Sequence, residues 1–158
     1  MKFKSQALSF ENHEAKAAYM QQGANRDASK PLVLDWAKQF SPIVNEWERA
    51  EAILRFSQRC IDYVNDPGVE ILDSASAALT RGFGDCDVKT RVFIALCKAC
   101  GIEAKVLPVF RDGGRRFPHV LAAVYLNDQW WKADPTIVNS KIGIVPKRGA
   151  ITNTWGKK

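Results

Sequence analysis

The spacing of hydrophobic residues divides the chain into a first part with helical periodicity and a second part typical of strands. After Ser41 and Pro42, a pair that suits a helix start, apolar residues recur at three- and four-residue steps and predict one long helix that ends before Pro67. Its apolar face consists of Ile43, Trp47, Ala50, Leu54, Ile61 and Val64. We expect this helix to serve as scaffold.

Two further helices follow with the same periodicity. The first is expected over residues 75–81, capped by Asp73 or Ser74 and stopped by the glycine that comes next. The second begins near Cys86 and ends at Gly101, because the apolar residues between them keep the helical spacing. Cys86 therefore lies at or just before a helix N-terminus.

From Glu103 onward the pattern is that of strands. Three are expected, at residues 104–110, 119–126 and 129–133, with a turn at Asn127 and Asp128 joining the last two. Helices first and strands afterwards indicate the α+β class, with an antiparallel sheet packed against the helix that begins near Cys86.

Three segments are expected along the chain. Residues 1–31 are polar and include only a modest helical stretch around Glu14 to Gln22, so we expect an N-terminal arm with little reason to pack. Residues 32–140 form the folded domain, and residues 141–158 form a basic tail.

Composition supports one folded domain. The chain has 158 residues, of which 46% are hydrophobic, and a chain of this length can bury a core without disulfides or a structural metal. No apolar run reaches the eighteen or so residues that cross a bilayer, and the first residues lack the apolar stretch of a secretory signal, so we expect a cytoplasmic protein without membrane association. The net charge of +6 permits an acidic partner without indicating one.

The four cysteines do not predict a disulfide framework or a metal site. Cys60, Cys86, Cys97 and Cys100 are too few and too unevenly spaced for a small secreted scaffold. Cys97 and Cys100 form a C-x-x-C, but no second pair and no nearby histidine pair completes a zinc site. We interpret both as core thiols, and we expect neither a metal nor a cofactor.

Cys86 is the candidate nucleophile. A helix N-terminus stabilises a thiolate because its unpaired N–H groups and the helix dipole point toward the sulfur, and Gly84 leaves room for a substrate or a tight turn beside it. Asp85 and Asp87 suit helix capping and tend to raise the thiol pKa, so we expect a histidine to supply the main activation and to bring this pKa below that of a free thiol. A buried, inert thiol is the alternative, which the polar neighbours disfavour.

His119 and Asp134 are placed together by the geometry of the predicted hairpin. With a two-residue turn at Asn127 and Asp128, His119 lies opposite Thr136, and Asp134 lies two residues from that partner on the same face. The carboxylate can then fix the tautomer of the imidazole and stabilise its charged form. Trp130 and Trp131 point to opposite faces, so one belongs to the core and the other shields this pair or lines the cleft.

Three sequence blocks occur together in a fixed order: LTRGFGDCDVKTRVFIALCKACGIEAKVLPV, FPHVLAAVYL and QWWKADPT. In this order they resemble the transglutaminase-like cysteine-enzyme superfamily, a circularly permuted relative of the papain group, over about residues 45–137. The resemblance implies a transglutaminase-like fold, with Cys86 as nucleophile, His119 as general base and Asp134 as the acid that orients it. The Cys86 backbone N–H suits one oxyanion donor, and the sequence identifies no second.

The resemblance implies a thiol-dependent amide-bond hydrolase, a peptidase or amidase, or an acyltransferase, acting on a protein or peptide through an acyl-enzyme. We favour hydrolysis, because small microbial and phage-type members are more often considered peptidases or amidases than cross-linking enzymes. The alternative is a non-catalytic binding or assembly module of the same fold. Nucleic-acid binding is the least favoured class, because no recognised motif is present.

Residues expected to bind substrate surround these three positions. They are Gly84, Asp85, Trp130, Trp131, Arg115 and Arg116. The two arginines belong to a loop with two glycines that directly precedes His119, and such a loop can gate a cleft or pair with an acidic substrate. The sequence does not determine the oligomeric state.

Overall fold

A four-stranded antiparallel sheet forms one layer of the part of the chain that the structure describes. The structure is a computed structural model, and it describes residues 7–8, 13–64, 70–71, 74–111, 119–145 and 151–153. The strand order is β7-β6-β5-β8, with bounds β5 (Ala104–Arg111), β6 (His119–Leu126), β7 (Gln129–Ala133) and β8 (Ile151–Asn153). The predicted antiparallel sheet and the α+β class are confirmed.

The hairpin between β6 and β7 has the predicted turn and register. Asn127 and Asp128 both have positive φ, 52° and 64°, as in the primed two-residue turns whose twist matches that of the flanking strands. Leu126 pairs with Gln129, and the pairing continues to Ala122 opposite Ala133. Local turn chemistry thus fixes which residues of the two strands share a face.

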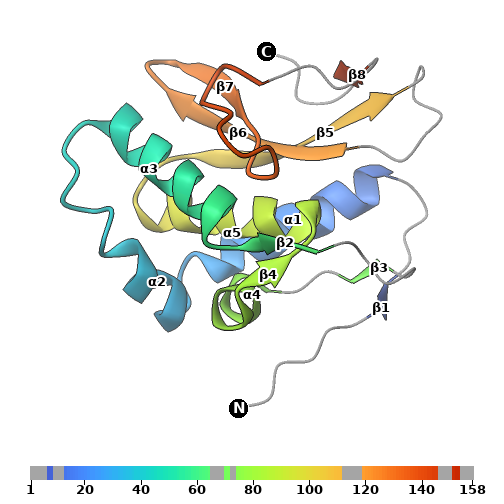
Figure 1. The fold of residues 1–158 in the computed structure, drawn as a ribbon, viewed down its shortest axis with the longest axis horizontal. Coiled ribbons are helices and arrows are strands. Elements are labelled where there is room, and N and C mark those ends of the chain that lie inside the picture. The colour runs from blue at the N-terminus through green and yellow to red at the C-terminus, as the bar shows by residue number, and fades with distance from the viewer. Residues whose placement is uncertain are drawn as a thin grey trace.

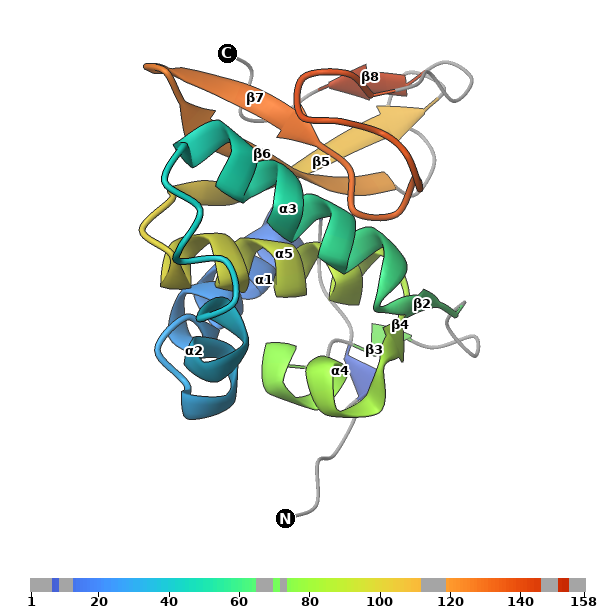
Figure 2. The same cartoon turned by 60° about the vertical axis from the view of Figure 1, so that its left-hand side comes forward.

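Helices cover one face of this sheet in two further layers (Figures 1 and 2). Those of the described residues are α1 (His13–Asp27), α2 (Pro31–Ala37), α3 (Glu46–Arg59), α4 (Ala75–Arg81) and α5 (Cys86–Ala99). α5 lies beneath the sheet between α1 and α3, and α2 and α4 pack against its far side. Since it is enclosed on several sides, α5 is buried from Asp87 to Cys97 and forms the centre of the core.

α4 and α5 begin and end as the sequence predicts. α4 spans Ala75–Arg81, the Ser74 side chain accepts a hydrogen bond from Ala77 N, and Gly82 has a φ of 85°. This left-handed conformation is one that glycine adopts without strain, so the helix stops there. α5 begins at Cys86 and is followed by Gly101, which has a φ of 80°.

The expectation that residues 1–31 form an arm with little reason to pack is wrong for α1. Ala17, Met20 and Ala24 are buried against the core. At the end of the helix, Asp27 accepts a hydrogen bond from Arg91 Nε on α5 at 2.6 Å, and this ion pair is itself buried. At the other end of the chain, β8 pairs with β5, so part of the expected tail over 141–158 belongs to the sheet.

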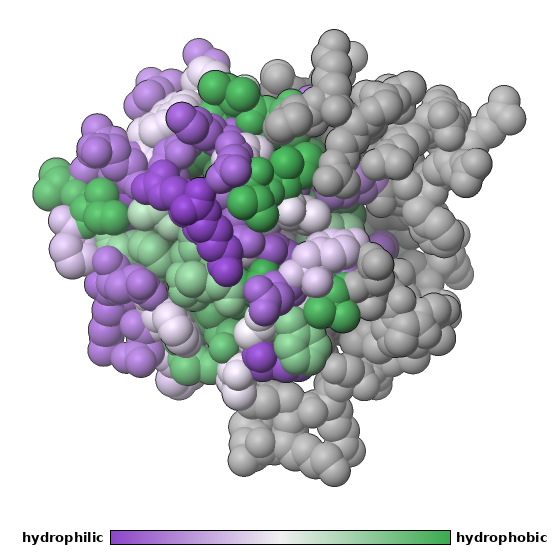
Figure 3. All heavy atoms as spheres, in the orientation of Figure 1, coloured by the Kyte–Doolittle hydropathy of each residue, from purple (hydrophilic) through white to green (hydrophobic). Residues whose placement is uncertain are grey.

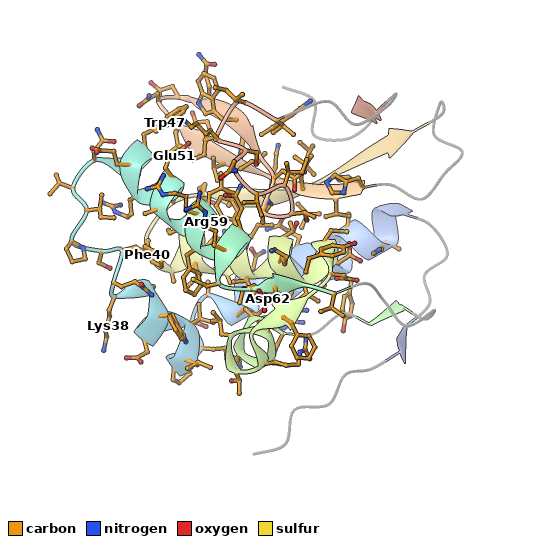
Figure 4. The ribbon with its side chains drawn as sticks, in the orientation of Figure 1. Lys38, Phe40, Trp47, Glu51, Arg59 and Asp62 are labelled. Atoms are coloured by element: carbon orange, nitrogen blue, oxygen red, sulfur yellow. The ribbon has the colours of Figure 1, made fainter. Side chains whose placement is uncertain are left out.

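α3 is shorter at both ends than the predicted helix. It begins at Glu46 rather than at Pro42, because the Asn45 side chain caps it by accepting from Glu48 N at 2.9 Å. It ends at Arg59, and the chain then forms β2 (Asp62–Tyr63) instead of continuing to Val64. Among the side chains labelled in Figure 4, Trp47, Glu51 and Arg59 lie along α3, and Asp62 follows in β2.

Short strand pairs at the base of the molecule were not predicted. β2 pairs in parallel with β4 (Phe83–Gly84), and β1 (Ala7–Leu8) pairs with β3 (Glu70–Ile71). Two residues per strand are too few for an alternating pattern to be visible in the sequence. The β2–β4 pair matters for function, because β4 leads directly into the start of α5.

The surface of the described region mixes polar and apolar residues. Figure 3 shows a band of hydrophilic side chains over α3, with hydrophobic patches on either side of it. Among the helices of the described residues, none combines the length and the apolar character needed to cross a bilayer.

Candidate active site

Cys86 is the first residue of α5, and the residues before it fix the start of this helix. The Asp85 side chain accepts a hydrogen bond from Val88 N at 3.0 Å and so caps the helix. A Cβ on Gly84 would lie 2.5 Å from Val88 Cγ1, so only glycine allows β4 to approach the first turn this closely. Gly84 and Asp85 are both buried and hold the nucleophile's helix in place; a role in binding substrate stays a prediction.

The beginning of β6 extends beyond β7 and lies against the first turns of α5. The pairing of β6 with β7 ends at Ala122, whereas β6 itself begins at His119. Opposite Val120 on the other neighbouring strand is Pro108, which has no N–H to offer, so the polar groups of Val120 point away from that strand. The backbone N–H of Val120 lowers the pKa of the Cys86 thiol, and Thr90 Oγ1 donates to the Val120 carbonyl at 3.4 Å.

This arrangement brings Cys86, the candidate nucleophile, near the residue that follows His119. The Val120 N–H, which lowers the pKa of Cys86, belongs to the peptide bond between His119 and Val120. Cys86 and Thr90 are four residues apart and so lie on one face of α5, and both contact this short piece of β6. The fold therefore brings Cys86 and the start of β6 together through contacts between a helix and a buried part of the strand that β7 leaves unpaired.

His119 and Asp134 form the predicted pair. His119 Nε2 lies 2.7 Å from Asp134 Oδ2, with the side chains 10% and 0% exposed. The other carboxylate oxygen, Oδ1, accepts from Thr136 N at 2.8 Å, so both oxygens of this buried group are bound. Because the carboxylate binds Nε2, Nδ1 is the ring nitrogen that does not contact Asp134.

Gln58 of α3, a residue that sequence reasoning missed, holds the loop that carries Asp134. Its side-chain nitrogen donates to the carbonyls of Asp134, Ile137 and Ser140 at 3.0–3.1 Å. The Ser140 hydroxyl donates to the same Asp134 carbonyl at 3.0 Å. In the sequence, the only sign of this role is a polar residue on the predicted helix. In the structure its helix neighbours Ile53 and Leu54 are buried.

Lys89, also missed, connects the nucleophile's helix to α3. It is 1% exposed, and its ammonium donates to the Gln58 carbonyl at 2.9 Å and to the Ile61 carbonyl. These carbonyls lie at the C-terminal end of α3, where a positive charge is favourable. Burial lowers the pKa of Lys89, while the carboxylates of Asp62 and Asp134 oppose this shift. A buried polar bridge therefore runs from α5 through Gln58 to the loop of Asp134.

The electrostatic environment of Cys86 differs from the expected one. Burial raises the pKa of the Cys86 thiol well above its usual value, and the carboxylates of Asp87 and Asp85 raise it further, as expected for these two neighbours. The Val120 N–H and Lys16 act in the opposite direction but more weakly. The direction of this shift contradicts the expectation of a thiol pKa below that of a free cysteine.

A model of the transglutaminase-like superfamily matches residues 35–135, more than half of the chain. The chain belongs to the transglutaminase-like superfamily. This family includes cysteine enzymes, and the chain carries its fold in the predicted α+β form. A comparison with curated proteins gives no match.

Two solved structures illustrate the transglutaminase-like fold of the chain. A candidate cysteine protease from Cytophaga hutchinsonii is 20% identical with a TM-score of 0.53, and the alignment covers 82% of this chain and 40% of that one. A candidate protease from Parabacteroides distasonis ATCC 8503 is 14% identical with a TM-score of 0.59, covering 88% of this chain and 32% of that one. At such identities the likeness concerns the fold alone, and the chain spans less than half the length of either relative.

The two tryptophans that were expected near the site of this transglutaminase-like domain lie on opposite faces of the sheet. Trp131 packs in the core, with its ring centroid 5.2 Å from that of Trp47 and its Nε1 donating to the Leu126 carbonyl. Trp130 lies on the outer face, where Lys105 stacks on its ring at 4.2 Å. These contacts place Trp131 in the core. A role of either ring in binding substrate stays a prediction. Arg115 and Arg116 fall outside the described residues.

The other three cysteines of the domain are free thiols. Cys97 is buried, Cys100 is partly buried and Cys60 is exposed. Burial raises the pKa of Cys97 well above its usual value, in agreement with a core thiol. Within the described ranges, no group of three or more His, Cys, Asp or Glu side chains is arranged to hold a metal ion.

Proposed function

We propose that this transglutaminase-like protein is a thiol-dependent amide-bond hydrolase that acts on a protein or peptide through Cys86, His119 and Asp134. The observation that carries the proposal is the 2.7 Å hydrogen bond between His119 and Asp134, at the start of the strand whose next residue, Val120, lowers the pKa of the Cys86 thiol through its N–H. A nucleophile, a base and a group that orients the base are the three parts of such a site.

The raised pKa of Cys86 indicates how the nucleophile is generated. Because the thiol is protonated at neutral pH, His119 Nδ1 accepts its proton as the sulfur attacks the substrate carbonyl carbon. The Asp134 carboxylate, bound to Nε2, stabilises the imidazolium that results. The Cys86 backbone N–H, at the helix N-terminus, donates to the oxyanion that forms.

The remaining steps return each group to its starting state. The imidazolium gives its proton to the leaving amine as the C–N bond breaks, which leaves an acyl thioester on Cys86. Water then attacks the thioester carbonyl, and His119 takes a proton from that water. The C–S bond breaks, the acid leaves, and the sulfur regains its proton. An amine in place of water would give acyl transfer with the same residues.

A non-catalytic binding module remains the second candidate, because one observation favours it. Burial and two flanking carboxylates disfavour the thiolate of Cys86. A domain that had lost catalysis would tolerate such an environment, whereas an enzyme must overcome it by proton transfer to His119.

Acylation by an activated peptide ester tests the proposal. We expect an acyl adduct on Cys86, mapped by mass spectrometry, that hydrolyses in wild type, is absent in Cys86→Ala and forms at least about tenfold more slowly in His119→Ala. The Cys60→Ser variant, which removes an exposed thiol, is the matched control and should behave as wild type.

The same assay separates the alternatives. A primary amine added to the reaction identifies an acyltransferase if the acyl-amine product exceeds the acid. Equal acylation of Cys60 and Cys86, or acylation of Cys86 that does not depend on His119, would favour the binding module.

A further inference from the structure

The first turn of α5 is linked to the N-terminal helix by an ion pair beside the sulfur. Lys16 Nζ on α1 lies 2.8 Å from Asp87 Oδ2, with the two side chains 13% and 4% exposed. The other oxygen of the same carboxylate, Asp87 Oδ1, lies 3.7 Å from Cys86 Sγ. The Asp87 carboxylate thus contacts both Cys86 and a lysine that is 71 residues earlier in the chain.

α1 holds Lys16 in this place by contacts along its whole length. Gln21 accepts from Val106 N at 2.7 Å and so ties the middle of the helix to β5. Asp27, at the end of the helix, forms the buried ion pair with Arg91 of α5. Since α1 is attached to both the sheet and the nucleophile's own helix, Lys16 faces Asp87 from a fixed support.

The charge of Lys16 matters because several groups act on the sulfur together. The cap residue Asp85 and Asp87 in the first turn of α5 contribute carboxylates, and β6 contributes the Val120 N–H. His119, which is bound to Asp134, lies one residue before Val120. Among these groups, Lys16 carries the positive charge of an ammonium. It is bound to Asp87, the carboxylate that raises the pKa of Cys86 more than Asp85 does. In a partly buried site such charges are poorly screened by solvent.

We propose that Lys16 is a positioning residue of the nucleophile site, which binds Asp87 and offsets the negative charge of this carboxylate beside the Cys86 sulfur. The inference rests on the proposed function for its catalytic meaning, but the effect on the sulfur is a property of the folded protein. This role of Lys16 involves α1 in the chemistry of the site. The helix precedes the segment that the family model matches.

The test is the rate at which iodoacetamide alkylates Cys86 in the full-length protein between pH 7 and pH 9. Below its pKa a thiol reacts in proportion to its thiolate fraction, so a raised pKa appears as a slower rate at a fixed pH. We expect Lys16→Met to react about threefold or more slowly than wild type at pH 8, and Lys16→Arg to restore the rate.

Lys98→Met is the matched control. Lys98 forms an ion pair of similar length, 3.1 Å to Glu103, at the opposite end of α5. Its removal should leave the alkylation of Cys86 unchanged. Lys16→Gln, a smaller change at the same position, serves if Lys16→Met fails to fold.

The outcomes separate this inference from the proposed function. Unchanged rates in Lys16→Met and Lys16→Gln, or an equal loss in Lys98→Met, would overturn the role of Lys16, even if acylation of Cys86 still depends on His119. Conversely, a slower rate in the Lys16 variants together with acylation that does not depend on His119 would support Lys16 and contradict the hydrolase.

Discussion

At the scale of single residues, opposing electrostatic influences act on the Cys86 sulfur. Burial and the neighbouring carboxylates stabilise the protonated thiol of Cys86, whereas the Val120 N–H and the ammonium of Lys16 stabilise the thiolate. In the proposed reaction the proton therefore moves as the sulfur attacks, and the hydrogen bond between His119 and Asp134 orients the group proposed to receive it. A preformed thiolate–imidazolium pair is not needed for this mechanism.

Replacing Asp87 should make the sulfur more reactive. Asp87→Asn removes a carboxylate that raises the pKa of Cys86, so this pKa falls and a larger fraction of thiolate is present at any fixed pH below it. We expect alkylation of Cys86 at pH 8 to become about threefold faster or more.

The pH profile provides the control for this substitution. In wild type, the rate should rise continuously from pH 7 to pH 9 without the plateau that a low pKa would produce. A plateau at neutral pH in wild type, or a slower rate in Asp87→Asn, would contradict the electrostatic account.

At the scale of elements, the sequence predicted best what depends on near neighbours. The turn at Asn127 and Asp128 fixes the register of the hairpin as far as Ala122 opposite Ala133, and this register directs His119 and Asp134 toward each other. The boundaries of α4 are set by the cap at Ser74 and by Gly82, which are likewise local signals.

The packing of α1 could not be predicted, because its determinants lie far away in the chain. Its buried residues include the small Ala17 and Ala24, which give a weak apolar pattern. Its ion pair joins Asp27 to Arg91, 64 residues later. Gln58 and Lys89 were missed for the same reason, since their partners are carbonyl groups brought near by the tertiary fold.

The attachment of α1 predicts a large loss of stability in Asp27→Ala. This change leaves Arg91 as a buried charge without its carboxylate and removes the acceptor of the Ala75 N–H at the start of α4. We expect the free energy of unfolding to fall by about 3–5 kcal/mol, as measured by urea denaturation.

Asp35→Ala is the comparison for this variant. Asp35 forms an exposed ion pair with Lys38 on α2, and its loss should change the free energy of unfolding by less than about 1 kcal/mol. Equal effects of the two substitutions would show that α1 is not anchored as described.

At the scale of the whole molecule, a central helix joins all parts of the site. α5 carries Cys86 at its start, contacts the sheet that carries His119, and is tied by Lys89 to the end of α3, whose Gln58 holds the loop of Asp134. The layers of helices and sheet thus converge on the first turns of one helix (Figure 2). The transglutaminase-like fold supplies the frame, and the proposed chemistry depends on this convergence.

The most direct measurement is the rate of iodoacetamide alkylation of Cys86 relative to Cys60 in wild type and in His119→Ala, with the modified sites mapped by mass spectrometry. Cys60 is exposed and serves as the internal reference for an ordinary thiol. If His119 accepts the proton of Cys86, the ratio of the two rates at pH 7–8 should fall by at least about tenfold in the variant. An unchanged ratio would contradict the proposal that Cys86 and His119 act together.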